Sequence, residues 1–436
     1  MNKVIMKRIL FCLLGCIVVL ATTYCVLRVY FSIDVFDRSG WYAENGEWHY
    51  LDYFGRPKTG WQEIDGKSYY FAPENGTMVT GWYPIDDSQH YFHEDGVPAA
   101  GWLQIDGKQY YLGNDGAVVK GWLQQDGKRY YLDNDGVVTT GWLELDGKHY
   151  YLTQEGYTVS GWNELDGVRY QFSEDGSTVV GWFEDASGKY FFGDDGRPCN
   201  GWLDWEQKRY YLKEDGAVTT GWLTLEEDLY YFLPDGRMAI GEVEIDGVSK
   251  FFTSNGKAVL MTNPWHPVPE DYSIDLIDFR GYRIDRNIQE PLQQMLSDCR
   301  AAGHYYTIKS AYRSKATQQW LWDDRVAQHM AEGMSRTQAV AYTSQTVAVP
   351  GHSEHQTGLA LDISGGQAMY DWLAEHCWDY GFILRYPDDR VDITGIVYEP
   401  WHFRYVGTEL SLELEALGLC MEEYMDMLTE EQKNIT

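Results

Sequence analysis

The hydrophobic pattern at the start of the chain differs from everything that follows it. Residues 9–27 contain no charged side chain, and three basic residues precede them within residues 1–8. A run of this length can cross a bilayer as one helix, and the basic end is expected on the cytoplasmic side. We therefore expect a transmembrane signal anchor at 9–28, a cytoplasmic N-terminus at 1–8 and all later residues outside the cell. A cleaved signal peptide is the alternative, but no small-x-small cleavage site stands out before Arg28.

From residue 40 to residue 261, aromatic and aliphatic positions recur with a period of 20 or 21 residues, after an expected linker at 29–39. Each unit, such as Gly141–Leu152, places hydrophobic residues on both sides of an Asp-Gly turn, which is typical of a β-hairpin. A Gly-Trp pair marks ten units, at Trp41, Trp61, Trp82, Trp102, Trp122, Trp142, Trp162, Trp182, Trp202 and Trp222. This regularity predicts a solenoid whose hairpins bury their aromatic faces against their neighbours.

The pattern changes again at residues 262–436, where helical and strand periods alternate. We expect helices at 289–301, 317–330 and 411–428, and strands at 358–363 and 395–399. This mixture predicts an α+β domain. The fold class is therefore multidomain, with an N-terminal transmembrane helix, an all-β repeat solenoid of hairpins and a C-terminal α+β domain.

Composition excludes some classes of function. The chain has 436 residues and a net charge of −31, which argues against binding to nucleic acid or to anionic lipid. Much of the acidity lies in the Asp-Gly turns. The sequence contains seven cysteines, of which Cys299 and Cys377 lie in the C-terminal domain, and it leaves open whether these two pair or stay as buried thiols.

Two short segments of the C-terminal domain contain the groups that a zinc hydrolase needs. His355 and Asp362 lie in the first, and Glu399-Pro-Trp-His402 forms the second. Catalytic zinc usually takes three protein ligands and keeps a fourth position for water. His355, Asp362 and His402 fit that number, and Glu399 remains as a base.

These two segments carry a family resemblance. The motif Ser-x-His-x-x-Gly-x-Ala-x-Asp at 353–362, together with Glu-Pro-Trp-His, resembles the VanY-type D-alanyl-D-alanine carboxypeptidases, a group of zinc peptidases. The likeness continues upstream through Ser310–Ser314 and reaches back to near Thr262. It implies an α+β zinc carboxypeptidase domain at 262–436.

Carried over position by position, the resemblance implies that His355, Asp362 and His402 bind Zn²⁺ and that Glu399 activates water. Arg313 would face the substrate, because its planar fork suits a terminal carboxylate or a developing oxyanion. Gln318 and Ser353 would be further polar contacts to the substrate.

The implied function is removal of terminal D-alanine from peptidoglycan stem peptides. The motifs leave open whether the enzyme is a D,D-carboxypeptidase or an L,D-carboxypeptidase acting on tetrapeptide stems. A wall adhesin or receptor that binds stem peptides without cleaving them is a further alternative, although the ligands and the base are all present.

The repeats resemble the cell-wall-binding or choline-binding repeats of Gram-positive surface proteins. A choline cage needs a second tryptophan before the paired aromatics, and the first unit keeps it, at Trp48. Other units replace it with Ser68, Gln109, Arg129, His149, Arg169 or Arg209. We therefore expect binding to wall polysaccharide or teichoic acid rather than choline, with a simple spacer as the alternative. The expected location is the cell membrane, crossed once, with the extracellular part at the cell wall.

Overall fold

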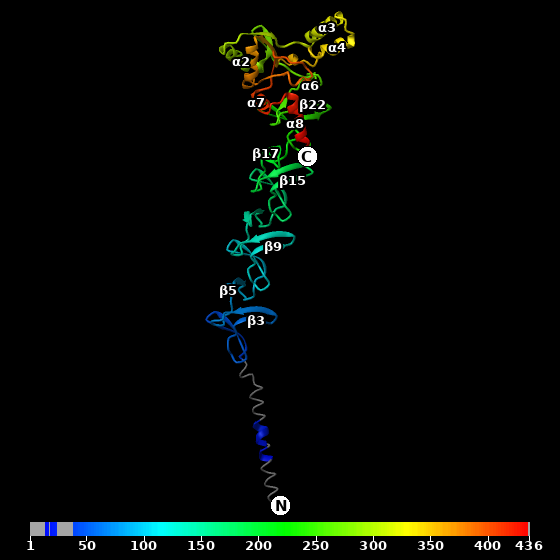
Figure 1. Cartoon of the computed structure of the whole chain (residues 1–436). Helices are drawn as coiled ribbons and strands as arrows, with labels where there is room; N and C mark the ends of the chain where they lie inside the picture. The colour runs from blue at the N-terminus through cyan, green and yellow to red at the C-terminus, as the bar shows by residue number, and fades with distance from the viewer. Residues whose placement is uncertain (1–13, 17, 24–37, 435–436) are drawn as a thin grey trace, which may run out of the picture. The chain divides into compact units, whose positions relative to one another are not determined.

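The computed structural model describes residues 14–16, 18–23 and 38–434 (Figure 1). The predicted anchor at 9–28 and linker at 29–39 lie mostly outside these residues. Residues 14–16 and 18–23 are helical. Within the described part of the chain, no helix combines the length and the apolar character needed to cross a membrane. Contacts divide the chain into two compact units, 1–180 with 194–197 and 181–193 with 198–436.

The first unit is a series of antiparallel two-stranded hairpins, as the repeat pattern predicts. Its strands are β1 (Gly40–Glu44), β2 (Glu47–Leu51), β3 (Gly60–Ile64), β4 (Lys67–Phe71), β5 (Gly81–Ile85), β6 (Ser88–Phe92), β7 (Gly101–Ile105), β8 (Lys108–Leu112), β9 (Gly121–Gln125), β10 (Lys128–Leu132), β11 (Gly141–Leu145), β12 (Lys148–Leu152), β13 (Gly161–Leu165) and β14 (Val168–Phe172). In the turn between β3 and β4, Asp65 and Gly66 have φ of 51° and 75°. Two positive φ values fit a two-residue turn that matches strand twist, and Asp-Gly is among the pairs that adopt it.

Successive hairpins are joined by the segment that follows each second strand. Val138 donates its backbone N–H to the carbonyl of Gln109 in an earlier hairpin at 2.9 Å. A Cβ at Gly136 would lie 1.8 Å from Cγ1 of Val118, so a side chain cannot be placed there without rearrangement. From β4 onwards, the last residue of each second strand, such as Leu132 and Leu152, is buried. The repeats are therefore held by small clusters to which neighbouring hairpins contribute.

The second unit continues the hairpins and then adds the C-terminal domain. The repeat strands are β15 (Gly181–Asp185), β16 (Gly188–Phe192), β17 (Gly201–Trp205), β18 (Lys208–Leu212), β19 (Gly221–Leu225), β20 (Asp228–Phe232), β21 (Gly241–Ile245), β22 (Val248–Phe252) and β23 (Ala258–Val259). The last three form one antiparallel sheet in the order β21-β22-β23.

The C-terminal domain is α+β, as predicted. Its elements are β24 (Leu276–Phe279), β25 (Tyr282–Asp285), η1 (Arg286–Ile288), α2 (Gln289–Ala301), β26 (Tyr306–Ser310), α3 (Lys315–Ala331), α4 (Arg336–Thr343), η2 (Glu354–Thr357), β27 (Ala360–Gly365), α5 (Gln367–His376), η3 (Cys377–Tyr380), β28 (Phe382–Leu384), α6 (Val391–Thr394), β29 (His402–Tyr405), α7 (Thr408–Leu417) and α8 (Met421–Asn434). Strands β26, β27, β29 and β28 form an antiparallel sheet in that order.

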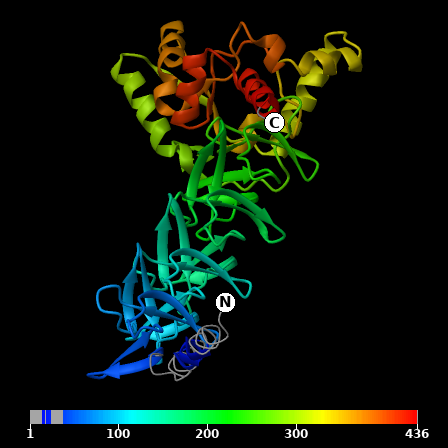
Figure 2. The ribbon, with the colours of Figure 1, turned by 90° about the horizontal axis from the view of Figure 1, so that it is seen from below.

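One core fixes this sheet against α2 and α5. Leu292 and Leu296 of α2, Leu361 of β27, Leu373 of α5 and Phe403 of β29 are fully buried in it. The α3–α4 pair lies on the opposite side of the domain from α2 in both views (Figures 1 and 2). The buried side chains of β27 and β29 hold the central part of the sheet, where these two strands are neighbours.

A second core joins the C-terminal helices to the last repeats. Met421, Tyr424 and Leu428 of α8 are buried together with Phe232 of β20 and Phe251 of β22. The backbone N–H groups of Ile240 and Glu242 donate to side chains of the same helix, at 2.6 and 2.7 Å. The last hairpins and the C-terminal domain therefore share hydrophobic side chains and hydrogen bonds.

Two predicted elements are wrong. Residues 395–399 form no strand. The short helix α6 ends at Gly395, whose backbone is left-handed, and the chain then passes through a loop to β29. The predicted helix at 411–428 is two helices, since Gly418 with φ of 66° ends α7. Cys299 and Cys377 are both free and buried, which settles their state as separate thiols.

Candidate metal centre and aromatic repeat sites

Strand pairing brings two of the predicted zinc ligands together. Asp362 of β27 stands directly opposite His402 of β29 in the antiparallel ladder. Directly opposed side chains lie on the same face of a sheet and within reach of each other. Nδ1 of His402 accordingly lies 3.1 Å from Oδ1 of Asp362.

The third ligand comes from the short helix η2, which ends at Gly358. Gly358 has φ of 71°, and a Cβ there would lie 2.6 Å from Ile274 and 3.0 Å from the backbone nitrogen of Asp285. Glycine therefore allows the chain to turn sharply into β27. His355 on this turn is buried, and its Nδ1 lies 2.7 Å from the carbonyl oxygen of Ala311. That contact makes Nδ1 the protonated nitrogen and directs the lone pair of Nε2 inward.

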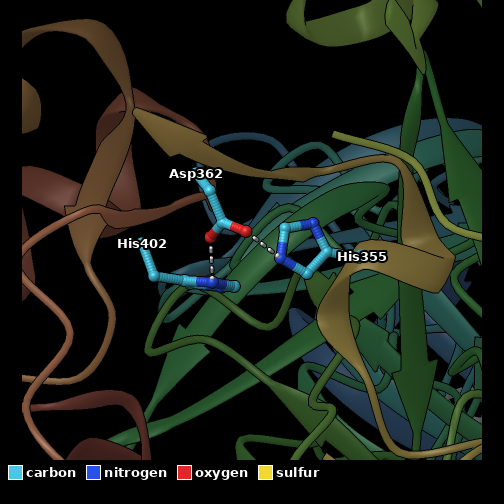
Figure 3. Close-up of side chains that lie close together, drawn as sticks. All are labelled: His355, Asp362 and His402. Carbon is cyan, nitrogen blue, oxygen red and sulfur yellow. Dashed lines mark hydrogen bonds and ion pairs between the residues drawn. The ribbon is translucent and has the colours of Figure 1, made fainter. Parts of the chain in front are cut away.

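The three side chains fit a zinc ion. One ligand atom from each of His355, Asp362 and His402 lies within 4.8 Å of the others. The carboxylate lies between the two rings (Figure 3), with Oδ2 at 3.2 Å from Nε2 of His355. This buried nitrogen finds no hydrogen-bond partner among the described residues, because the 3.2 Å contact lacks hydrogen-bond geometry. Two imidazoles and a carboxylate are a donor set that zinc prefers, and Nε2 of His355 is a donor atom with no other partner in the described part of the chain.

Electrostatics at the three residues also favour a cation. Burial lowers the pKa of His355 to about 4, which keeps its imidazole neutral. Burial would also lower the pKa of His402, but hydrogen bonds to Asp362 and Glu354 outweigh it and raise the value to about 9. Burial alone would raise the pKa of Asp362, yet the two histidines lower it well below its ordinary value. Asp362 therefore stays ionised, and the carboxylates around His402 stabilise a positive charge at this place.

A buried ionic network contacts His402 at Nε2, and the sequence pattern does not predict it. Oε2 of Glu354 lies 3.3 Å from Nε2 of His402, and Oε1 accepts from Arg385 Nε at 2.9 Å. Arg385 in turn donates to both carboxylate oxygens of Glu422, at 2.6 and 2.9 Å. The adjacency of Glu354 to His355 was the only sequence signal, and an acidic residue beside a histidine ordinarily indicates an exposed loop.

Glu399 lies beside the three ligands. Its Oε2 is 3.7 Å from Nδ1 of His402, and its backbone N–H donates to the carbonyl of Tyr386. Burial raises the pKa of Glu399 to about 7, while nearby His402 opposes the shift and Asp362 adds to it. A carboxyl group with a pKa near neutrality can accept and release a proton at physiological pH.

The remaining predicted residues line the same cleft, whose volume is about 280 Å³. Arg313 points to the metal ligands, with Nη2 at 3.8 Å from Oδ2 of Asp362, and burial lowers its pKa. Gln318 accepts from Nη1 of Arg313 at 3.0 Å and donates to the carbonyl of Ala348, so it orients the guanidinium rather than facing outward. Ser353 is buried in the wall of the cleft. Trp401 also lines the cleft and is 38% exposed.

Three of the Gly-Trp tryptophans each have an arginine of the same chain over the ring. In the first unit the guanidinium of Arg129 lies 3.8 Å from the ring centre of Trp122, and that of Arg169 lies 3.9 Å from Trp162. In the second unit Arg209 lies 4.5 Å from Trp202. These arginines occupy the position where the first repeat has Trp48, which is 48% exposed. Each guanidinium therefore covers a face of its tryptophan ring.

Comparison with known proteins agrees with this division of the chain. A family model for D-alanyl-D-alanine carboxypeptidases, VanY, matches residues 281–408. A choline-binding repeat model matches 58–97 and 99–139, and a cell wall binding repeat model matches 220–238.

Individual relatives match the C-terminal domain. A D-alanyl-D-alanine carboxypeptidase of Enterococcus faecalis is 42% identical over 176 residues, which are 39% of this chain and 66%, just under two thirds, of that protein. The bifunctional D-Ala-D-Ala dipeptidase and carboxypeptidase VanXYC of Enterococcus gallinarum is 40% identical over 28% of this chain and 67% of its own length. A solved zinc complex of a mutant of the vancomycin resistance D,D-pentapeptidase VanY, from a VanB-type resistance cassette, is 43% identical over 38% of this chain and 97% of that one, with a TM-score of 0.37. By the family model and the sequence relatives, the chain belongs to the VanY family of D-alanyl-D-alanine carboxypeptidases, with choline-binding-type repeats preceding the family's domain.

Proposed function

We propose that this protein is a zinc D-alanyl-D-alanine carboxypeptidase that trims peptidoglycan stem peptides. The observation that carries the proposal is the group of His355, Asp362 and His402, with Glu399 beside it and Arg313 facing it. His355 would bind zinc through Nε2, Asp362 through its carboxylate and His402 through Nδ1. A bound zinc ion supplies a Lewis acid, which makes water a nucleophile near neutral pH and polarises a carbonyl group.

The side chains around the three ligands supply the rest of the reaction. Glu399 takes the proton from the attacking water and delivers it to the leaving amine, a role that its pKa of about 7 supports. Arg313 pairs with the terminal carboxylate of the peptide or with the oxyanion that develops at the scissile carbonyl. Gln318 holds the guanidinium in place, and Ser353 contributes a hydroxyl to the cleft wall. A free terminal carboxylate as the partner of Arg313 favours an exopeptidase.

Mass spectrometry of defined stems tests this proposal. The full-length protein with zinc is incubated with a pentapeptide stem and with a tetrapeptide stem. Loss of one alanine from the pentapeptide alone is the expected D,D result, and loss from the tetrapeptide would instead establish L,D specificity. Glu399→Gln should abolish the reaction, and Glu375→Gln, at an exposed position on α5, should leave it intact. Zinc-loaded, folded protein that cleaves neither stem would contradict the proposal and favour a receptor that binds stems without cleavage.

The second part of the proposal is that the repeats hold the enzyme at the wall through polysaccharide or teichoic acid. The likeness to choline-binding and cell wall binding repeats supports a wall ligand. The arginines over Trp122, Trp162 and Trp202 favour a ligand other than choline, because their guanidinium groups already occupy the aromatic faces. Sedimentation of the full-length protein with purified walls should therefore persist in the presence of free choline. Release by choline would contradict this part, and no sedimentation at all would favour a spacer.

The third part concerns location. We propose that residues 9–28 anchor the chain in the membrane, that residues 40–261 form the wall-binding region outside the cell and that residues 262–436 form the enzyme. The uncharged run at 9–27 and the basic residues before it support this topology. Protease added to intact cells should remove the enzyme part and leave residues 1–8 protected, and an unanchored, released protein would contradict the proposal.

A further inference from the structure

The network behind His402 extends from the metal site to the C-terminal helix. It consists of Glu354, Arg385 and Glu422, whose side chains are 0%, 0% and 9% exposed. Arg385 bridges the two carboxylates, and its contact with Glu422 uses both terminal nitrogens of the guanidinium. Arg404 adds a second positive charge, with Nη1 at 3.2 Å from Oε1 of Glu354. Two carboxylates and two guanidinium groups therefore balance in charge inside the domain.

One member of this network and one of its hydrogen-bond partners come from outside the region that matches the VanY family model. Glu422 on α8 follows residue 408, where the match ends. Asn263, which donates to Oε1 of Glu422 at 3.0 Å, precedes residue 281, where the match begins. The carbonyl of Leu260 accepts from Arg404 at 2.9 Å. Segments on both sides of the matched region therefore complete the support of the metal site.

The geometry gives this support a chemical role. A carboxylate at Nε2 of His402 accepts a hydrogen bond from the N–H of that nitrogen, which leaves the lone pair on Nδ1 for a metal ion. Glu354 can accept this hydrogen bond only if its carboxylate is ionised and keeps its position. The guanidinium groups of Arg385 and Arg404 stabilise the negative charge and hold the carboxylate in place. Arg385 in turn would be an uncompensated buried charge without Glu422.

We propose that Glu422 is a positioning residue for zinc, acting through Arg385 and Glu354 to hold the ring of His402 in its metal-binding orientation. The inference rests on the proposed function, because it assigns His402 to the metal. The helix that carries Glu422 is itself fixed on the last repeat, where Thr429 and Gln432 accept hydrogen bonds from Glu242 and Ile240. The last hairpin thereby becomes part of the framework that holds the metal site.

Metal binding by the full-length protein tests the proposal. The metal-free protein is titrated with Co²⁺, whose visible absorption reports the ligand geometry, and zinc affinity is measured by competition with a chromophoric chelator. Glu422→Gln should weaken binding of both ions by about 10-fold to 100-fold and alter the Co²⁺ spectrum. The matched control is Glu423→Gln on the same helix, which removes a partly exposed ion pair with Arg390 and should leave affinity and spectrum as in the wild type.

Thermal unfolding without metal separates positioning from folding. If Glu422→Gln folds and binds Co²⁺ with wild-type affinity and spectrum while the wild type cleaves stem peptides, the inference is overturned and the proposed function stands. If the wild type binds neither metal, the proposed function is contradicted, and so is the inference that rests on it. Should Glu422→Gln fail to fold, Glu422→Asp replaces it, because it keeps the charge and shortens the reach. Weaker Co²⁺ binding is expected of that variant too, and wild-type binding and spectrum would overturn the inference.

Discussion

Asp362 and His402 are opposite each other in the β27–β29 ladder, and the ladder itself sets the 3.1 Å distance between the carboxylate and the ring. Both strands lie in the centre of the sheet, where Leu361 and Phe403 are fully buried. Two ligands are therefore held before any metal binds, and little ordering is needed when one does.

This arrangement makes Asp362 the most sensitive position of the site. Asp362→Asn keeps the shape of the side chain but removes the charge between the two imidazoles, so zinc affinity should fall by more than about 100-fold, beyond the range for outer residues. Chelator competition measures the change. Asp371→Asn on α5, where Asp371 accepts from Gln367, provides the control and should bind zinc normally. Equal affinity in the two variants would remove Asp362 from the ligand set.

The pKa of Glu399 predicts how activity depends on pH. The carboxylate must be ionised to accept a proton, and burial places its pKa at about 7. The rate should therefore fall tenfold per unit as pH decreases below the pKa of Glu399, which a bound Zn²⁺ lowers from the metal-free value of about 7. A pH profile of kcat/KM on a pentapeptide stem measures this limb. An acid limb at a pH above 7 would contradict the assignment.

The raised pKa of Glu399 also predicts how the stability of the metal-free protein depends on pH. The rate should increase as pH rises, whereas the stability should decrease. Because the pKa of Glu399 is raised on folding, the group favours the folded state below its unfolded value of 4.5, and that contribution is lost as pH rises towards 7. Above pH 7, metal-free Glu399→Gln should have a free energy of unfolding up to about 3 kcal/mol larger than the wild type. Denaturant unfolding at pH 4.5 and pH 8 checks this, and an equal difference at both values would contradict it.

Arg313 should distinguish peptides by their C-terminal group. Its planar fork can pair with two carboxylate oxygens, whereas an amide offers only one oxygen. Wild-type enzyme should prefer a free C-terminus over a C-terminal amide, and Arg313→Ala should lower kcat/KM by about 100-fold for the free acid and much less for the amide. Arg325→Ala, on helix α3 at the edge of the cleft, is the control variant, and its kcat/KM on the two peptides is compared with that of Arg313→Ala. Equal losses on both peptides would assign Arg313 to the oxyanion instead.

Arg129 should stabilise the repeats through its contact with Trp122. Its guanidinium also donates to the carbonyl of Asp175, so Arg129→Ala removes a stacked cation and a hydrogen bond. We expect a loss of about 1–2 kcal/mol, seen as an earlier change in tryptophan fluorescence on heating. Lys108→Ala, at an exposed position of β8, should have little effect. Unchanged unfolding in both variants would show that the stacking is incidental.

Much of the site could be predicted because short motifs determine it locally. Gly358 and the alternation along 360–362 place His355 and Asp362 near each other, and helix α2 at 289–301 follows from its spacing of buried residues. Glu399 was placed on a strand because Ile396, Val397 and Tyr398 are strand-forming residues. These residues form no strand in the structure, because the short helix α6 precedes them and ends at Gly395, whose backbone is left-handed.

The support behind the site could not be predicted, because its members are distant in sequence and ordinary in type. Glu354, Arg385 and Glu422 carry charges that usually indicate exposed positions, and each is buried because an opposite charge lies beside it. Gln318 was predicted to touch substrate, and only the folded chain shows it bonded to Arg313. Long-range pairing of charges leaves no periodic signal in the sequence.

The core shared by α8 and the last hairpins has a consequence for anyone dividing this protein into pieces. Met421, Tyr424 and Leu428 meet Phe232, Phe251 and Met261 in one cluster. A fragment beginning at residue 262 would leave the helix side of that cluster in water, where a contiguous apolar patch promotes aggregation. Soluble enzyme should therefore be sought in fragments that keep the final two repeats.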